Sequence, residues 1–250
     1  MRGEEEGVRS GGEAGPFSGQ APETRRWHSR VLKFSLFAAG CAGLVAEFVL
    51  STLASYLLGN STVQWTLTIS LMLFSMGLGS RLSRHLQGDL LDRFIGIELI
   101  LSLLCASCAL ACYALAAFLP HQTDLLIYSF CLAIGLLIGL EIPLVTRINQ
   151  AYESLRVNIS SVMESDYYGA LVGGVIFAFL AFPWLGLTYT PVALGGVNLL
   201  VALVLYGRFR PLLHHPRILG LGLALGGGLL LGLGLFAQPI LLFGEQSRYR

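Results

Sequence analysis

Charged residues are scarce in this chain. Of its 250 residues 12% are charged and 54% are hydrophobic, and the mean hydropathy is +0.69. A soluble domain carries about 25% charged residues, because its surface has to remain hydrated. This deficit excludes a soluble globular domain and predicts a lipid bilayer as the surrounding medium. The net charge is only +1, so no overall basic field favours nucleic acid as a partner.

Recognisable catalytic motifs are also lacking. The sequence contains no HExxH zinc motif, no phosphate-binding loop and no arrangement of Ser, His and Asp that predicts a catalytic triad. The glycine-rich stretch 220–234 lies inside a hydrophobic run and follows no strand, so it does not predict a phosphate site. We therefore predict no catalytic residue, no metal ligand and no cofactor in this chain.

The cysteines and the adjacent histidines do not change this prediction. Three cysteines have the spacing of one helix face, where a thiol cluster for metal or redox chemistry would need His or acidic co-ligands. We interpret them as small apolar packing residues; they are Cys105, Cys108 and Cys112. His214 and His215 predict a basic surface patch facing anionic lipid. A metal site there is the weaker alternative, because adjacent imidazoles point apart.

Long hydrophobic runs occupy most of the sequence. The first extends to Leu58, whereas the hydrophobic part of a signal peptide has about 7–15 residues, so we prefer a membrane span to a twin-arginine or lipoprotein signal ending at Cys41. Six more runs reach the ~20 residues that cross a bilayer. They are Thr62–Gly79, Phe94–Leu119, Leu125–Val145, Asp166–Pro183, Leu185–Tyr206 and Ile218–Phe243.

These runs predict the fold class and the domains. We expect an all-α, polytopic membrane bundle of about seven transmembrane helices over residues 29–243. Residues 1–28 are expected to be a disordered cytoplasmic tail, and residues 244–250 a short tail that could begin a further soluble domain. The fifth and sixth spans, which meet near Pro183 and Trp184, could instead be a broken or re-entrant pair.

Basic residues fall on one side of the predicted bundle. Six precede the first run up to Lys33, and eight more occupy the connections after the second, fourth and sixth runs. These eight are Arg81, Arg84, Arg93, Arg147, Arg156, Arg208, Arg210 and Arg217. The opposite connections, 59–61, 120–124 and 183–185, have none. The positive-inside rule predicts a multi-pass protein of the cell membrane, the inner membrane in a bacterium, with a cytoplasmic N-terminus.

Acidic and polar residues inside the hydrophobic runs are the candidate functional residues, because a charge in hydrocarbon is costly unless it is paired or hydrated. From the helical rise, Glu98, Glu141 and Asp166 are predicted to share the cytoplasmic third of the bundle, and Glu47 lies deeper. The neutral polar candidates are Gln64 and Asn198. Pro143 is expected to kink the fourth helix around Glu141.

Two roles remain open for Glu98, Glu141 and Asp166. They could line a water-filled vestibule that binds a cation or relays protons, or they could pair with Arg93, Arg147 or neighbouring backbone and lock the bundle. Glu47 has no basic residue at its depth. For Glu47 we therefore favour a functional role, because an unpaired buried charge is the costlier arrangement.

Glycines four residues apart predict close contacts between helices. Such pairs give a flat strip that lets two backbones approach in lipid. The pairs are Gly135 and Gly139, Gly169 and Gly173, Gly222 and Gly226, and Gly228 and Gly232.

Several segments of the sequence form a recognisable combination. They are 47–60, 64–70, 74–81, 139–143 and 166–173. Together they resemble the N-terminal multi-span membrane domain of membrane-bound spermidine synthase-like proteins, the polyamine aminopropyltransferase family. The resemblance implies a soluble aminopropyltransferase domain or subunit as partner, which moves an aminopropyl group from decarboxylated S-adenosylmethionine to putrescine. It also implies a polyamine cation as a possible ligand.

The resemblance carries over no catalytic or nucleotide-binding residue, so we expect the catalytic domain to be lacking in this chain. Residues 77–84 also resemble the basic loop of major-facilitator transporters. The alternative functions are therefore a small secondary transporter or exporter of a polyamine or another cation, and a purely structural anchor.

Overall fold

The computed structural model describes residues 22–248, with side chains placed over 26–237 except Pro120. This part of the chain is entirely helical. Its helices are α1 (Pro22–Leu58), α2 (Ser61–Ser83), α3 (Leu90–Phe118), α4 (Thr123–Asn149), α5 (Leu155–Ile176), α6 (Phe182–Phe209) and α7 (Pro216–Arg248), with short helical turns η1 (Pro120–Gln122), η2 (Phe177–Ala181) and η3 (Arg210–Leu212). Residues 1–21 of the expected disordered tail lie outside the described residues, and α1 already begins at Pro22.

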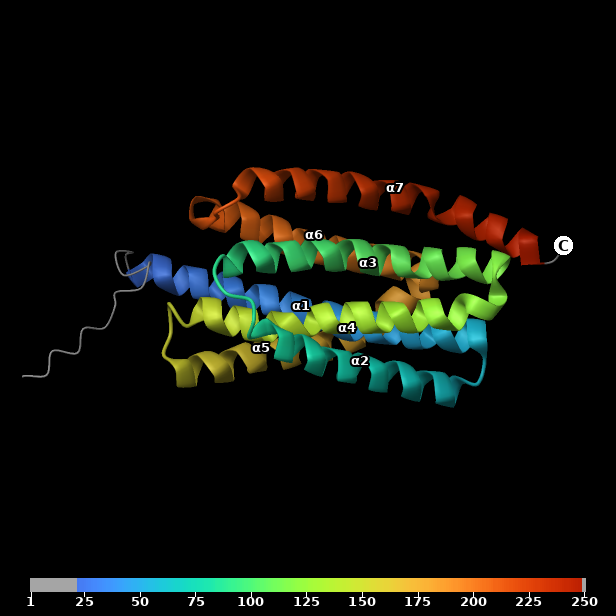
Figure 1. The fold of residues 1–250 in the computed structure, drawn as a ribbon, viewed down its shortest axis with the longest axis horizontal. Coiled ribbons are helices and arrows are strands. Elements are labelled where there is room, and N and C mark those ends of the chain that lie inside the picture. The colour runs from blue at the N-terminus through green and yellow to red at the C-terminus, as the bar shows by residue number, and fades with distance from the viewer. Residues whose placement is uncertain (1–21, 249–250) are drawn as a thin grey trace, which may run out of the picture.

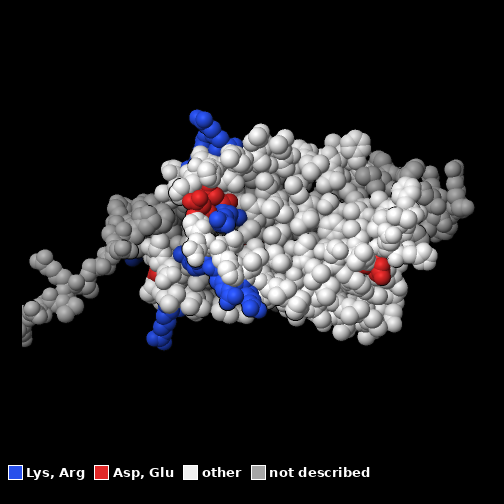
Figure 2. Space-filling view, in the orientation of Figure 1, with Lys and Arg blue, Asp and Glu red and all other residues white. Residues whose placement is uncertain are grey.

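Successive helices run antiparallel along one long axis (Figure 1). The connections α2–α3, α4–α5 and α6–α7 therefore lie at the same end of the bundle as the start of α1. We call this the basic end, because these connections and the adjoining helix turns carry the eight arginines named above. Figure 2 shows Lys and Arg side chains gathered toward this end, on the left, and little charge elsewhere on this face.

The number of separate spans differs from the sequence prediction. In the described residues six helical segments, not seven, are long and apolar enough to cross a membrane. The count differs from seven because α5, η2, α6 and η3 follow one another without a break over residues 155–212 and are counted as one segment. The chain reverses within it at Gly186, whose φ is 63° and ψ is −172°. Glycine adopts positive φ without steric cost, so the reversal needs no loop, and it falls after Pro183 and Trp184.

The α2–α4 pair packs closely because glycines of α4 face the backbone of α2. A β-carbon at Gly135 would lie 2.9 Å from the carbonyl oxygen of Met72, and one at Gly139 would collide with the backbone of Met76. A serine continues the contact, because the Ser75 hydroxyl donates to the carbonyl of Leu132 on α4. These contacts confirm the predicted packing of the first glycine pair.

The α1–α5 pair is built in the same way. Gly169 and Gly173 of α5 face the backbone of Phe37 and Cys41 in α1, which confirms the second predicted pair. Two further pairs lie on α7: Gly222 and Gly226 touch Leu99 of α3, but Gly228 and Gly232 have nothing within 4 Å among the described residues. The prediction that the last pair packs against another helix is therefore wrong for the part of the chain that is described.

Polar contacts fasten the connections at the basic end. Glu153, between α4 and α5, accepts hydrogen bonds from Lys33 Nζ at 2.7 Å and Ser29 Oγ at 2.9 Å, both on α1. Burial raises the pKa of the Glu153 carboxyl, but the hydrogen bonds and the positive charge of Lys33 outweigh it, so the pKa lies below its ordinary value. This contact ties the α4–α5 connection to α1.

The start of α7 is held by α3. The backbone N–H groups of His214 and His215 donate to the two carboxylate oxygens of Asp92, at 3.2 and 2.8 Å. The Nδ1 atom of His214 lies 2.9 Å from Asp89. The expected basic surface patch therefore includes an acidic partner at His214, and its contact with anionic lipid stays a prediction.

We expect Gly139→Ala to destabilise the bundle, because the new methyl group has to displace the backbone of Met76. Overpacking of this kind costs about 1–3 kcal/mol. The matched control is Gly77→Ala on α2, where nothing lies within 4 Å and alanine gains helix propensity. Melting temperatures in mild detergent should fall for the first variant and stay level or rise for the second. Equal temperatures for both variants would contradict the close α2–α4 contact.

Candidate functional site

Two glutamates from neighbouring helices lie buried at the same depth. Glu98 of α3 and Glu141 of α4 have exposed fractions of 0% and 2%. Glu98 follows the start of α3 by eight residues and Glu141 precedes the end of α4 by eight, so each lies about 12 Å from the basic end. The two carboxyl groups interact electrostatically. The structure thus brings together two residues that the sequence places 43 positions apart.

Asp166 of α5 completes this group. Its carboxyl group is half-buried and interacts electrostatically with Glu141. It lies against Gly40 of α1, where an added β-carbon would approach Asp166 Oδ1 to 2.7 Å. The absence of a side chain at Gly40 therefore leaves room for the Asp166 carboxyl. We call Glu98, Glu141 and Asp166 the three-carboxylate cluster.

Within the described part of the chain, no basic side chain forms a salt bridge with the cluster. Among the described residues the salt bridges are Lys33 with Glu153 and His214 with Asp89, both at the basic end. Arg147 instead donates to the carbonyl of Ser83 at 3.0 Å. The alternative in which Arg93 or Arg147 locks the cluster by ion pairing is therefore not the arrangement of this structure.

The cluster also holds polar atoms without partners. Both carboxylate oxygens of Glu98 and the hydroxyl of Ser102, one turn further along α3, are buried and accept or donate no hydrogen bond to the described residues. Such orphaned groups usually indicate a water, an ion or a ligand. Sequence reasoning missed Ser102, although its spacing of four residues from Glu98 was the available signal.

The two neutral polar candidates lie at different places in the bundle. Asn198 of α6 is buried, and its Nδ2 lies 3.9 Å from the sulfur of Cys105, which in turn interacts with Glu98 and Glu141. Gln64 accepts a hydrogen bond from Tyr128 at 2.7 Å, near the end opposite the basic end.

Glu47 and Pro143 complete the predicted set. Glu47 of α1 is half-buried and interacts with Cys131 of α4, apart from the three-carboxylate cluster. Helix α4 continues through Pro143 without interruption, and the kink there stays a prediction.

The cysteines take part in packing. Cys105, Cys108, Cys112 and Cys131 are free and belong to the main hydrophobic core. This confirms the interpretation of the α3 cysteine face as packing residues.

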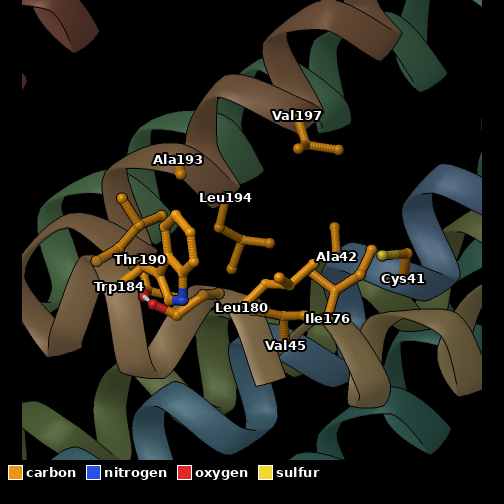
Figure 3. A pocket seen from close by; sticks show the side chains of 12 residues that line it. Cys41, Ala42, Val45, Ile176, Leu180, Trp184, Thr190, Ala193, Leu194 and Val197 are labelled. Atoms are coloured by element: carbon orange, nitrogen blue, oxygen red, sulfur yellow. Dashed lines mark hydrogen bonds between the residues drawn. The ribbon is translucent and has the colours of Figure 1, made fainter. Parts of the chain in front are cut away.

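A cavity of about 360 Å³ lies between α1 and the reversal of the α5–α6 segment, and none of the acidic candidates lines it (Figure 3). Its walls are largely apolar, and the hydroxyl of Thr190 in this lining donates to the carbonyl of Ala181 at 3.1 Å. The exposed indole of Trp184 projects beside it. None of the residues that line it is charged, so the cavity offers no ion-pair partner to a charged ligand.

We expect Glu98→Met to raise the melting temperature of the chain when no amine is present. Replacing a buried carboxyl group that has no hydrogen-bond partner by an apolar side chain of similar volume removes a desolvation penalty of about 1–3 kcal/mol. Glu98→Gln is the matched control. It leaves a buried amide without hydrogen-bond partners, so its melting temperature should rise little. A Glu98→Met chain that melts well below the wild type in detergent would show that the carboxyl has a stabilising partner.

Several known proteins that are similar to this chain share one name, polyamine aminopropyltransferase. The chain is 48% identical over 185 residues to polyamine aminopropyltransferase 2 of Aquifex aeolicus, a match that covers 73% of this chain and 37% of that protein. It is 35% identical over 227 residues to polyamine aminopropyltransferase of Oceanobacillus iheyensis, covering 89% and 44%. It is 36% identical over 210 residues to polyamine aminopropyltransferase 2 of Streptomyces coelicolor, covering 78% and 38%.

No model of a known protein family matches the chain, and no solved structure does. The chain spans less than half the length of these curated relatives. Their names lend no support to the transporter alternative. Over most of its length, the chain is similar to proteins named polyamine aminopropyltransferase, and these matches support that family for it.

Proposed function

We propose that this chain is the membrane-embedded helical domain of a protein of the polyamine aminopropyltransferase family. We further propose that its three-carboxylate cluster binds the cationic amine that such a protein handles. Aminopropyl transfer itself we assign to the part of such proteins outside the match, since the match leaves more than half of the relatives' length uncovered. The observation that carries the proposal is the pair of buried glutamates without a basic partner.

The outer surface of the bundle supports lipid as its surroundings. Large apolar side chains face outward along α4, α5, η2 and α7, with exposed fractions of 67–78% at Leu171, Leu125, Phe179 and Leu235. Soluble monomers rarely expose a contiguous apolar patch beyond a few hundred Å². In a bilayer the same surface costs nothing, because lipid tails are as apolar as the side chains.

The distribution of charge supports an orientation and a ligand class. The stretches 34–80, 94–146, 157–207 and 218–247 contain no Lys or Arg, although the acidic candidates all lie within them. Basic residues at one end favour a cytoplasmic location for that end and for the N-terminus of the chain. Acidic groups without internal cations favour a cation from outside the bundle.

The chemistry of the cluster suits a protonated amine. An ammonium group donates three hydrogen bonds, and carboxylates are its strongest acceptors. Glu98 and Glu141 supply two carboxyl groups at one depth, and the orphaned Ser102 hydroxyl supplies a neutral acceptor. Asp166, against α1, is placed to take a second ammonium group of a diamine. Putrescine is therefore the probe of choice.

The test measures binding of radiolabelled putrescine to the chain in lipid nanodiscs by equilibrium dialysis. The wild-type chain should bind putrescine in this assay. In a separate test of membrane embedding, it should stay in the membrane fraction after an alkaline carbonate wash. Glu98→Gln and Glu141→Gln should each weaken binding about tenfold or more, because each removes one partner of a buried charge contact. The matched control is Glu164→Gln, an exposed acid midway along α5 and two residues before Asp166, which should bind as the wild type does.

Two outcomes would contradict the proposal. If alkaline carbonate releases the chain from membranes, lipid is not its surrounding medium. If putrescine binds equally well to the wild type and to both cluster variants, the cluster is not the amine site.

A further inference from the structure

A second row of polar atoms without partners lies on α1, apart from the three-carboxylate cluster. Glu47, Ser51 and Ser55 follow one another at intervals of four residues, so they share one face of the helix. Ser51 is completely buried, and the hydroxyl oxygens of Ser51 and Ser55 have no hydrogen-bond partner among the described residues. The row starts at Glu47, about 16 Å from the end of α1 at Leu58, and ends near the α1–α2 turn.

A third orphaned hydroxyl comes from α2. Thr68 is fully buried, and its Oγ1 also has no partner. The Cys131 thiol of α4 lies near both the Thr68 hydroxyl, with which it does not meet hydrogen-bond geometry, and the Glu47 carboxyl. Helices α1, α2 and α4 pack against one another in this region. We call Glu47, Ser51, Ser55 and Thr68 the α1–α2 hydroxyl site.

Helix geometry does not explain these unpaired hydroxyls. Ser and Thr in a helix ordinarily satisfy themselves by donating to the carbonyl one turn earlier. Several hydroxyls of this chain do so, including Thr52 to Phe48 at 2.7 Å and Thr66 to Thr62 at 2.8 Å. Thr52 is the direct neighbour of Ser51, so the same turn of α1 contains a satisfied and an unsatisfied hydroxyl. The Ser51 hydroxyl is therefore not satisfied by its own helix and stays available to a partner.

We propose that the α1–α2 hydroxyl site binds a primary ammonium group, reached from the end of the bundle opposite the basic end. The carboxylate of Glu47 and the hydroxyls of Ser51 and Thr68 offer one acceptor each for the three N–H donors of such a group. A divalent metal is disfavoured, because Ca²⁺ and Mg²⁺ require six or more oxygen ligands and usually several carboxylates. The inference rests on the proposed membrane location and not on the three-carboxylate cluster.

The position of the site agrees with entry from that end. Ser55 lies one turn from the end of α1, and its side chain is only half-buried. The hydrogen-bonded pair of Gln64 and Tyr128 lies at the same end, with Gln64 one turn before Thr68 on α2. No Lys or Arg occurs in residues 34–80 or 94–146, so no internal cation competes for Glu47.

The test follows labelling of individual carboxyl groups by dicyclohexylcarbodiimide, which reacts with carboxyl groups in apolar surroundings. The chain in lipid nanodiscs is labelled with and without methylammonium chloride, and the peptide containing Glu47 is quantified by mass spectrometry. Methylammonium should protect Glu47. Tetramethylammonium, which carries the same charge without an N–H donor, should not protect it at the same concentration.

Single substitutions test whether the Ser51 and Thr68 hydroxyls contribute to the binding of methylammonium. Ser51→Ala and Thr68→Val should each raise the methylammonium concentration for half-protection about tenfold, through the loss of one hydrogen bond to a charged group. The matched control Thr52→Ala removes a hydroxyl that is bonded within α1 and should leave protection unchanged. Glu141→Gln should also leave the protection of Glu47 unchanged. The two proposed amine sites can therefore fail independently of each other.

The proposal is overturned if both cations protect Glu47 equally, or if neither protects it. It is also overturned if the two hydroxyl variants behave like Thr52→Ala. Should Glu47 resist labelling altogether, melting temperatures provide the second readout: methylammonium has to stabilise the wild type more than Glu47→Gln, and an equal effect rejects the site.

Discussion

A carboxyl group inside an apolar helical bundle is stable only as a neutral acid or beside a cation, and this constraint governs the chain. Glu98 and Glu141 are buried at one depth with Asp166 beside them, while the Lys and Arg residues lie outside the apolar stretches. Replacing the glutamates with apolar residues would favour packing. We therefore propose that their presence among well-packed helices reflects a ligand requirement that is met at some expense of stability.

The helix packing serves this constraint. Glycines bring α2 against α4 and α1 against α5 at backbone contact, which holds the neighbours of the acidic residues without bulky side chains. Gly40 is the most direct case, because the Asp166 carboxyl lies in the space that a β-carbon would fill. The same physical feature, the absence of a side chain, thus sets the helix spacing and leaves room for a polar group.

Much of this arrangement could be predicted from the sequence. Run length and apolar composition predicted an all-helical bundle, and the constant helical rise placed Glu98 and Glu141 at one level before any contact was known. The α5–α6 reversal could not be predicted, because the turn at Gly186 depends on a positive φ rather than on a polar loop. The hydroxyl groups without hydrogen-bond partners could not be predicted either. Ser51 and Thr52 are adjacent hydroxyl residues in the sequence, and only the structure shows that Thr52 has a hydrogen-bond partner and Ser51 has none.

The central claim is that the buried glutamates change from neutral acids to carboxylates when an amine binds. Infrared difference spectroscopy of the chain in lipid nanodiscs, with and without putrescine, measures this change directly. The account predicts loss of the protonated-carboxyl band and gain of a carboxylate band, both absent in the Glu98→Gln, Glu141→Gln double variant. A difference spectrum without these bands, or one that the double variant reproduces, would contradict it.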